Sequence, residues 1–328
     1  MAVRITNKYG LDDVFVRAVM VDTHVTKGDI SCTTLIDAPQ IRILKMKHDV
    51  EEDVSDRIWM LFGTAVHHIL ERSELKAHKA RILLEASEVF RETGDEKAMV
   101  WLSNKARELF PEAFDTKDEW ETTLNVSING MIISGTFDKF KFAEKTIQDY
   151  KVTSTYAYTY EESKKKWYAQ QNIYRYMAAM NGYDVEKCEI VGIFKDWNQS
   201  SKMRNKDYPE TPVMTIPIPI YDNDTMEKYL AKRVRLHQMA LDGDVPECTP
   251  KEMWATSDTY AVTAPGRKKA IKLFTKESAA QGFMTNNQFK HKGMYIDFRP
   301  GERKRCDKYC PVRDVCPQYK KYKESLEQ

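Results

Sequence analysis

The sequence lacks the long apolar runs that membrane insertion requires. No stretch approaches about 18 consecutive uncharged apolar residues, and the mean hydropathy is −0.60. The first residues, MAVRITNKYGLDD, also lack the apolar segment of a secretory signal. We therefore expect a cytoplasmic protein with no membrane partner. A hydrophobic content of 42% in 328 residues suits a packed core and excludes a disordered chain.

Cysteine and net charge are scarce as well. Six cysteines are too few for a disulfide scaffold, and 51 basic against 49 acidic residues leave a net charge of +2. The charge is uneven, however, because 16 Lys or Arg stand against 7 Asp or Glu between residues 264 and 328. A surface with that excess can follow a phosphate backbone, so the C-terminal region is a predicted contact for DNA.

What the sequence does contain is a succession of helical and strand patterns. Residues 55–75, with Ser55 as N-cap, and 79–109, divided at Gly94, show helical spacing. From residue 120 the period changes to two, and Asn129-Gly130 supplies the type I′ turn of a β-hairpin that returns to residue 140. Further strands are predicted at 146–152, 189–194 and 213–220, and further helices at 162–181 and 222–241. This order predicts a mixed α/β fold.

We interpret the chain as three parts of one structural unit. Residues 1–118 form an N-terminal segment and helical cover, residues 119–244 form the core, and residues 245–328 form a basic accessory region. No linker rich in Gly, Ser and Pro separates the last two parts, so the accessory region is expected to pack on the core.

Two acidic residues and a lysine are expected to meet on neighbouring strands. Asp138 lies near the end of the second hairpin strand, and Asp149 and Lys151 share one face of the next strand because they are two residues apart. Carboxylates hold Mg²⁺ or Mn²⁺ through oxygen, and such metals polarise a phosphate and activate water, while an ammonium stabilises developing charge. This combination of two carboxylates and an ammonium suits metal-dependent phosphodiester hydrolysis.

With these residues the chain resembles the PD-(D/E)xK nuclease superfamily, and within it the RecB-like branch, which includes CRISPR adaptation exonucleases and many phage exonucleases. The resemblance extends from about residue 33 to residue 319. It implies a restriction-endonuclease-like core, in which helices flank a central mixed sheet. The motifs that carry it, in order, are Gly63-Thr-Ala-Val-His67, Gly135-Thr-Phe-Asp138, Asp149-Tyr-Lys151 and Gln170-x-x-x-Tyr174.

The resemblance also implies a role for each matching residue. Lys151 would assist the attacking water, and Gln170 and Tyr174, on one helix face, would position the substrate or the lysine. Asp149 stands where many relatives have Glu, and its shorter arm can shift the metal. Glu71, four residues after His67, is a further candidate ligand. The implied metal ligands are His67, Asp138, Asp149 and the carbonyl of Tyr150.

Basic residues near the predicted site are candidates for DNA contact. Lys164, Lys165 and Lys166 lie one turn before Gln170 and could grip the backbone. In the accessory region, Lys304 and Arg305 are predicted to hold DNA in the same way.

The cysteines indicate a second metal site. Cys306, Cys310 and Cys316 crowd into eleven residues, and a tetrahedral site needs one further ligand. Cys248, in a turn-like segment nearer to this triplet, is the preferred fourth ligand, and Cys32 is the alternative. Relatives with a similar C-terminal triplet carry a [4Fe–4S] cluster, although their first cysteine lies near the N-terminus and their triplet spacing differs slightly. Four thiolates would also suit Zn²⁺.

These observations predict a metal-dependent deoxyribonuclease, an exonuclease rather than an endonuclease, with a role in DNA recombination, repair or degradation in a bacterium or a phage-infected cell. The sequence lacks a G-x-x-x-x-G-K-[ST] motif, so any unwinding would come from a separate helicase or recombinase. The alternative is a catalytically silent iron–sulfur or zinc subunit that binds DNA and serves such a partner. The third possibility, a structural protein stapled by zinc, leaves the His67 and Gln170 motifs unexplained.

Overall fold

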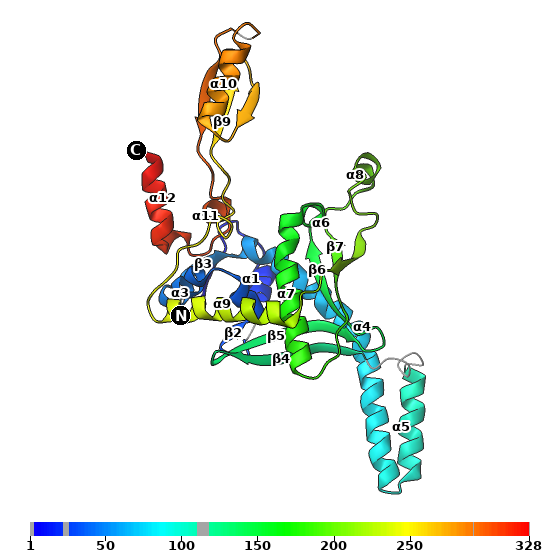
Figure 1. Cartoon of the computed structure of the whole chain (residues 1–328). Coiled ribbons are helices and arrows are strands. Elements are labelled where there is room, and N and C mark those ends of the chain that lie inside the picture. The colour runs from blue at the N-terminus through cyan, green and yellow to red at the C-terminus, as the bar shows by residue number, and fades with distance from the viewer. Residues whose placement is uncertain (1–2, 22–25, 110–117, 291, 328) are drawn as a thin grey trace. The chain divides into compact units, whose positions relative to one another are not determined.

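The computed structural model describes residues 3–21, 26–109, 118–290 and 292–327 (Figure 1). These residues divide into two compact units, each made of segments far apart in the sequence. Of the described residues, the larger unit contains those within 4–36 and 51–238, and the smaller contains residue 3 and those within 37–50 and 239–327. The division expected from the sequence, with boundaries after residues 118 and 244, follows chain order instead and stays a prediction.

A mixed six-stranded sheet forms the centre of the larger unit. The strands follow the order β2-β5-β6-β7-β8, with β4 paired to β5. Two pairs, β2 with β5 and β6 with β7, are parallel, and the others are antiparallel. The predicted mixed α/β class, with helices flanking a mixed sheet, is confirmed. The strands are β2 (Ile30–Ser31), β4 (Glu119–Ile128), β5 (Met131–Lys141), β6 (Thr146–Thr153), β7 (Lys187–Phe194) and β8 (Val213–Ile218).

The hairpin of β4 and β5 forms as its turn sequence predicts. Asn129 and Gly130 have φ angles of 47° and 79°, which are the two positive values of a type I′ turn. The two-residue turn fixes the register, and Ile128 pairs with Met131. On β5, Ile133 and Phe137 are fully buried, so one face of the hairpin enters the core.

The helix α7 (Glu161–Met180) covers part of the sheet of the larger unit. Tyr174 from α7 and Cys32 from α2 (Cys32–Ile36) meet at Gly135, where an added Cβ would lie 2.5 Å from the Cys32 sulfur and 2.8 Å from the Tyr174 ring. Only glycine fits this approach. Gly135 therefore lets a helix pack directly against the strand that carries Asp138.

The helical cover differs from the prediction in one respect. A single helix, α4 (Val54–Glu92), replaces the two helices expected over 55–75 and 79–92. Its N-cap is Asp53 rather than Ser55, because the Asp53 carboxylate accepts the backbone N–H of Ser55 at 3.0 Å. As predicted, Gly94 with its positive φ ends it, and α5 (Glu96–Leu109) packs alongside (Figure 1). The other helices are α1 (Asp13–Val21), α6 (Thr155–Thr159), α8 (Gln199–Arg204) and α9 (Asn223–Leu241).

The smaller unit has its own apolar core. Ile41 and Leu44 of α3 (Pro39–Lys47) pack with Val312 and Cys316, so a segment near the N-terminus meets the C-terminal cysteine triplet. A three-stranded sheet in the order β10-β9-β11 is covered by α10. The elements are β9 (Thr259–Thr263), β10 (Lys272–Phe274), α10 (Glu277–Asn287), β11 (Tyr295–Arg299), α11 (Lys304–Lys308), a 3₁₀ turn (Arg313–Val315) and α12 (Pro317–Glu327).

Two short strands complete the described elements, β1 (Val3–Thr6) paired with β3 (Val50–Asp53). None of the helices in the described ranges combines the length and the apolar character needed to span a bilayer.

Candidate active site and cysteine site

The residues expected at the catalytic centre line one cleft of about 780 Å³ in the larger unit. The cleft runs over the ends of β4, β5 and β6, with α4 and α7 supplying side chains from outside the sheet. The side chain of Glu71, the further candidate ligand, lies outside the described residues. The predicted residues that line the cleft are His67, Asp138, Asp149, Tyr150, Lys151, Gln170 and Tyr174.

Asp138 and Asp149 lie side by side because the β5–β6 ladder ends beside them. Lys139 pairs with Gln148, and the Tyr150 N–H donates to the Asp138 carboxylate at 2.6 Å. Burial, with the adjacent Asp149 charge, raises the pKa of Asp138 to about 6. Two buried carboxylates that interact electrostatically repel each other when both are ionised, so a divalent cation between them would lower their free energy.

Lys151 forms an ion pair with Asp149, with 2.6 Å between Nζ and the carboxylate. Burial alone would lower the pKa of Lys151, but the Asp149 and Asp138 carboxylates outweigh it and raise that pKa above the usual lysine value. The ammonium therefore stays protonated at neutral pH and can donate hydrogen bonds but not accept a proton.

His67 reaches the same place from α4. Its Nε2 lies 2.8 Å from the Tyr150 carbonyl, and its Nδ1 lies 3.5 Å from the Asp138 carboxylate. If Nε2 carries the proton and donates it to the carbonyl, Nδ1 presents a lone pair toward Asp138. A ring nitrogen held in this way is ready to ligate a metal ion.

Glu121 joins this group although the sequence reasoning did not include it. Potential ligand atoms of His67, Glu121 and Asp138 all lie within 4.8 Å of one another. Glu121 has a φ of 47°, and the β4–β5 ladder is interrupted there, since Trp120 pairs with Lys139 and the next pair is formed by Thr122. Left-handed backbone in a non-glycine residue is costly and often marks a functional site.

A signal for Glu121 was present in the sequence. In a hairpin with a two-residue turn at 129–130, cross-strand partners have residue numbers that add up to the same value, so position 121 must face Asp138. Directly opposite residues have side chains on the same face of the sheet. The hairpin prediction therefore already implied that these two carboxylates are neighbours.

Gln170 and Tyr174 interact with each other as well as with the cleft. The Gln170 side-chain amide donates to the Tyr174 hydroxyl at 2.8 Å, as expected for residues four apart on a helix. Tyr174 is 6% exposed, and burial raises its pKa well above the usual tyrosine value. Its hydroxyl is therefore a neutral group, fixed beside the carboxylates.

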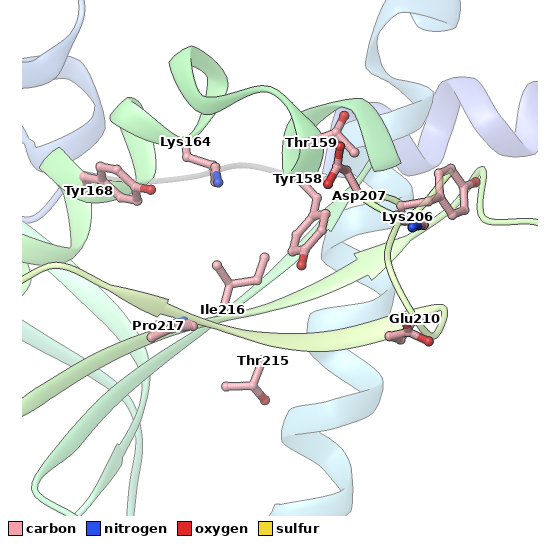
Figure 2. Close-up of a pocket in the computed structure, with 11 residues that line it drawn as sticks. Tyr158, Thr159, Lys164, Tyr168, Lys206, Asp207, Glu210, Thr215, Ile216 and Pro217 are labelled. Atoms are coloured by element: carbon pink, nitrogen blue, oxygen red, sulfur yellow. The ribbon is translucent and has the colours of Figure 1, made fainter. Parts of the chain in front are cut away.

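The three lysines at the start of α7 lie outside the lining of this cleft. Lys164 pairs with Glu161 at 2.7 Å, and Lys165 pairs with Glu162. Figure 2 shows Lys164 and Tyr168 at another pocket, on the side of α7 that faces β8. Residues 158–159, the loop after α8 and residues 215–217 of β8 complete its lining. The glutamates neutralise two of these lysines, which weakens their attraction for phosphate.

The four cysteines assigned to a cluster lie together in the smaller unit. Cys248, Cys306, Cys310 and Cys316 line one small cavity, and no disulfide joins them. Gln318 holds the Cys248 backbone at both its N–H and its carbonyl, each at 2.9 Å. A buried side chain, Gln40 of α3, accepts from the Cys248 thiol at 3.2 Å.

The electrostatics of these thiols suit a metal. Burial, with nearby Glu252 and the other cysteines, raises the pKa of Cys248 to about 12, and burial with its neighbours raises the pKa of Cys306 to about 11. Thiols of this kind ionise only when a cation offsets their charge.

Cys32 lies in the larger unit and packs in its core, with its sulfur 3.4 Å from that of Met177. It is buried by apolar neighbours and by the ring of Tyr174 at Gly135. The structure thus groups Cys248 with the triplet and gives Cys32 a packing role.

The two basic residues beside the triplet have different surroundings. Arg305 forms a bidentate ion pair with Asp37, at 2.7 and 2.5 Å, and its side chain is 11% exposed. Lys304 is exposed. Arg305 therefore joins the cysteine segment to the start of α3, a structural contact that occupies both terminal nitrogens.

The fold and the cleft agree with a family comparison. A model of the PD-(D/E)XK nuclease superfamily matches residues 42–317. This match covers most of the chain, and the protein belongs to that superfamily. Membership supports a nuclease activity and a divalent metal at the cleft.

Other comparisons are more distant. No curated protein sequence matches the chain. Among solved structures, the crystal structure of SSO0001 is similar at 14% identity with a TM-score of 0.38, over 70% of this chain and 86% of that one. A candidate exonuclease from Eubacterium rectale is similar at 10% identity with a TM-score of 0.29, over 50% and 69% of the two chains. Both TM-scores are below 0.5, so the family assignment rests on the family model.

Proposed function

We propose that this protein is a Mg²⁺- or Mn²⁺-dependent deoxyribonuclease that acts as an exonuclease on DNA ends or single strands. The observation that carries the proposal is the meeting of His67, Glu121 and Asp138 within 4.8 Å, beside the Asp149–Lys151 pair. Carboxylate oxygens suit both metals, and an imidazole nitrogen favours Mn²⁺ over Mg²⁺.

The donor atoms fit a hydrolytic metal. Asp138 and Asp149 are almost fully buried, at 8% and 1% exposure, and the pKa of Asp138 is raised, so a cation is the natural partner of the ionised pair. When bound, Mg²⁺ or Mn²⁺ supplies the polarisation of the scissile phosphate and the acidity of the attacking water. His67, Asp138 and Asp149 would hold it, with Glu121 or the Tyr150 carbonyl as a further ligand.

Lys151 acts in this proposal as a cation. Its raised pKa keeps the ammonium charged, so it orients the nucleophilic water and stabilises the charge that develops on the phosphate. It does not remove a proton. Gln170 and Tyr174 position Lys151 and the substrate, because their hydrogen bond fixes two neutral polar groups at the edge of the carboxylate pair.

The cysteine site supports assignment to the RecB-like branch with a [4Fe–4S] cluster. Cys248, Cys306, Cys310 and Cys316 line one small cavity, which is the number of thiolates that such a cluster needs. Cys248 is the proposed fourth ligand. Zn²⁺ is the alternative metal, since four thiolates also bind it tetrahedrally.

The proposed role is recombination, repair or degradation of DNA in a bacterial or phage-infected cell. Strand separation would come from a separate helicase or recombinase. Lys164, Lys165, Lys166 and Lys304 remain proposed DNA contacts.

The test is degradation of linear DNA labelled at the 5′ or the 3′ end, as single or double strands, with Mg²⁺, Mn²⁺ or EDTA. Wild-type protein should shorten labelled strands from an end only when metal is present, and Asp138→Ala and Lys151→Ala should not. Asp184→Asn, an exposed carboxylate paired with Lys145 on the surface, is the matched control. Equal degradation by all four proteins would refute the site, and internal cuts in circular DNA would refute the exonuclease mode.

A further inference from the structure

Residues 259–299 form a small module within the smaller unit, inserted in sequence between Cys248 and Cys306. It consists of β9, β10 and β11 with α10 against the sheet (Figure 1). The chain enters and leaves it at one place, because Ala255 bridges to Arg303 and the Thr256 N–H donates to the Glu302 carbonyl at 2.9 Å. None of the cleft or cysteine residues belongs to it.

Positive charge is concentrated in this module. Residues 259–299 contain eight Lys or Arg and two acidic residues, Glu277 and Asp297. One of these two carboxylates, that of Asp297, already forms an ion pair with Arg299 at 2.8 Å. The module is therefore strongly basic in a chain whose total charge is close to zero.

Two loops bring most of this charge to one end of the module. The loop between β9 and β10 carries Arg267, Lys268 and Lys269, and the segment between α10 and β11 carries Lys290 and Lys292. All five are exposed. The loops adjoin, since a Cβ added to Gly293 would lie 3.5 Å from Cδ of Pro265. We call these five residues the basic end.

Within the described parts of the chain, no carboxylate forms an ion pair with a residue of the basic end. The lysines at the start of α7 are different, because Glu161 and Glu162 pair with two of them. Unneutralised cations side by side repel one another, and a polyanion that binds them removes this repulsion and releases counterions.

Aromatic side chains stand among these cations. Phe289 is 93% exposed and precedes Lys290, and Tyr295 is 51% exposed at the start of β11. An exposed ring offers a flat apolar face to a ligand. Bases of an unpaired strand stack on such rings, whereas bases inside a duplex are already stacked on one another.

We propose that the basic end, with Phe289 and Tyr295, is a binding site for single-stranded DNA, separate from the cleft. The cations contact the phosphates, and the two rings stack on bases. The inference rests on the proposed function for the identity of its ligand as DNA. It assigns strand binding to this module, so that a substrate can be held by residues that take no part in hydrolysis.

The test measures binding of the full chain in EDTA to a fluorescent oligo-dT of about 20 nucleotides, at several salt concentrations. Arg267→Glu/Lys268→Glu/Lys269→Glu should weaken binding at least tenfold and reduce the slope of log K against log salt by about 2, because each phosphate contact on a single strand contributes about 0.7. Lys290→Gln/Lys292→Gln removes charge more mildly and should act in the same direction.

Two further variants make the result specific. Phe289→Ala/Tyr295→Ala should weaken binding to oligo-dT but leave binding to a duplex within twofold, because a duplex offers no free base faces. The control Arg91→Glu/Lys97→Glu/Arg107→Glu places the same charge change on α4 and α5 and should leave binding within twofold. Thermal unfolding of each variant checks that it is folded.

Several results would overturn the inference. Unchanged oligo-dT affinity in both charge variants would do so, as would equal losses on single strands and duplex in the aromatic variant. Loss of polyglutamate binding with unchanged DNA affinity would assign the surface to an acidic protein instead. A failure of the nuclease proposal is distinguishable, because it appears as absent cleavage in metal while oligo-dT binding in EDTA stays dependent on the basic end.

Discussion

The cleft and the cysteine site both gather potential metal ligands, but they differ in chemistry and in how the fold positions them. The cleft presents oxygen and nitrogen from strands and a helix, whereas the cysteine site presents sulfur from turns and short helices. Hard ligands select Mg²⁺ or Mn²⁺, and soft thiolates select iron or zinc. The ligand types of the two sites therefore favour different metals.

The difference also bears on what each site does for the protein. Asp138 and Asp149 are held by sheet register, which backbone hydrogen bonds determine. The cysteine segment joins a small apolar cluster that includes Val312 and Ile41, and the Arg305–Asp37 pair also links it to the start of α3. Disrupting the cleft should mainly affect chemistry, and disrupting the cysteine site should mainly affect stability.

The largest expected effect follows from Asp138→Ala. Loss of a metal ligand should lower the rate of DNA cleavage by roughly 10³-fold, which corresponds to several kcal/mol of transition-state stabilisation. The metal content of the cysteine site should be unchanged. Single-turnover cleavage and elemental analysis measure the two quantities, and a parallel loss of both would show that the sites are not independent.

Cys248→Ser should affect the cysteine site and the stability of the protein rather than the chemistry of the cleft. It should abolish absorbance near 400 nm in protein purified anaerobically and lower the Tm by about 10 °C, because a structural metal contributes several kcal/mol to folding. Cys32→Ser is the comparison, since Cys32 packs in the core of the larger unit and should leave iron content unchanged. Full iron content in Cys248→Ser, with loss in Cys32→Ser, would reverse the assignment of the fourth ligand.

Substitutions at Glu121 separate its charge from its backbone conformation. Both Glu121→Ala and Glu121→Gly should reduce cleavage about 10- to 100-fold, because each removes a carboxylate near the metal. Glycine accepts the φ of 47°, whereas alanine is strained there, so the glycine variant should be about 1 kcal/mol more stable than the alanine variant. Denaturant unfolding of the pair measures this difference, and equal stabilities would show that the position is unstrained.

The remaining expected effect is on pH dependence. The pKa of Asp138 is raised to about 6, so the folded protein retains a proton that the unfolded chain releases near pH 4. Metal-free stability should therefore fall as pH rises from about 4 to 6, and apparent Mg²⁺ affinity should rise up to tenfold per unit and level off above 6. Thermal unfolding with and without Mg²⁺ across this range tests both trends, which Asp138→Asn should flatten.

The local part of this structure was accessible from the sequence because short-range rules determine it. The Asn129-Gly130 turn fixes the hairpin register, and through it the position of Glu121 across from Asp138, although the ladder is interrupted at that point. The pairing of Lys164 with Glu161 likewise follows from a separation of three residues on a helix.

Contacts between distant segments were not accessible in this way. Arg305 meets Asp37 across 268 positions, and nothing in either local sequence indicates the other. Gln40 beside the cysteine site is a similar case, because it depends on how α3 packs against the triplet. The long helix α4 was divided in the prediction since its apolar stripe weakens, although no Gly or Pro lies between residues 75 and 79.

The chain enters and leaves the module of residues 259–299 at one place, where Ala255 bridges to Arg303, and we call this place the neck. The neck has a consequence for how this protein can change over evolutionary time. An insertion closed at its base imposes on its host only the entropy of a loop, and this cost grows slowly with loop length. The residues beyond the neck can then be lengthened, shortened or exchanged while Cys248 and Cys306 keep their places. The module can therefore be exchanged without disturbing the rest of the fold, and exchange would change which nucleic acids the protein prefers to bind.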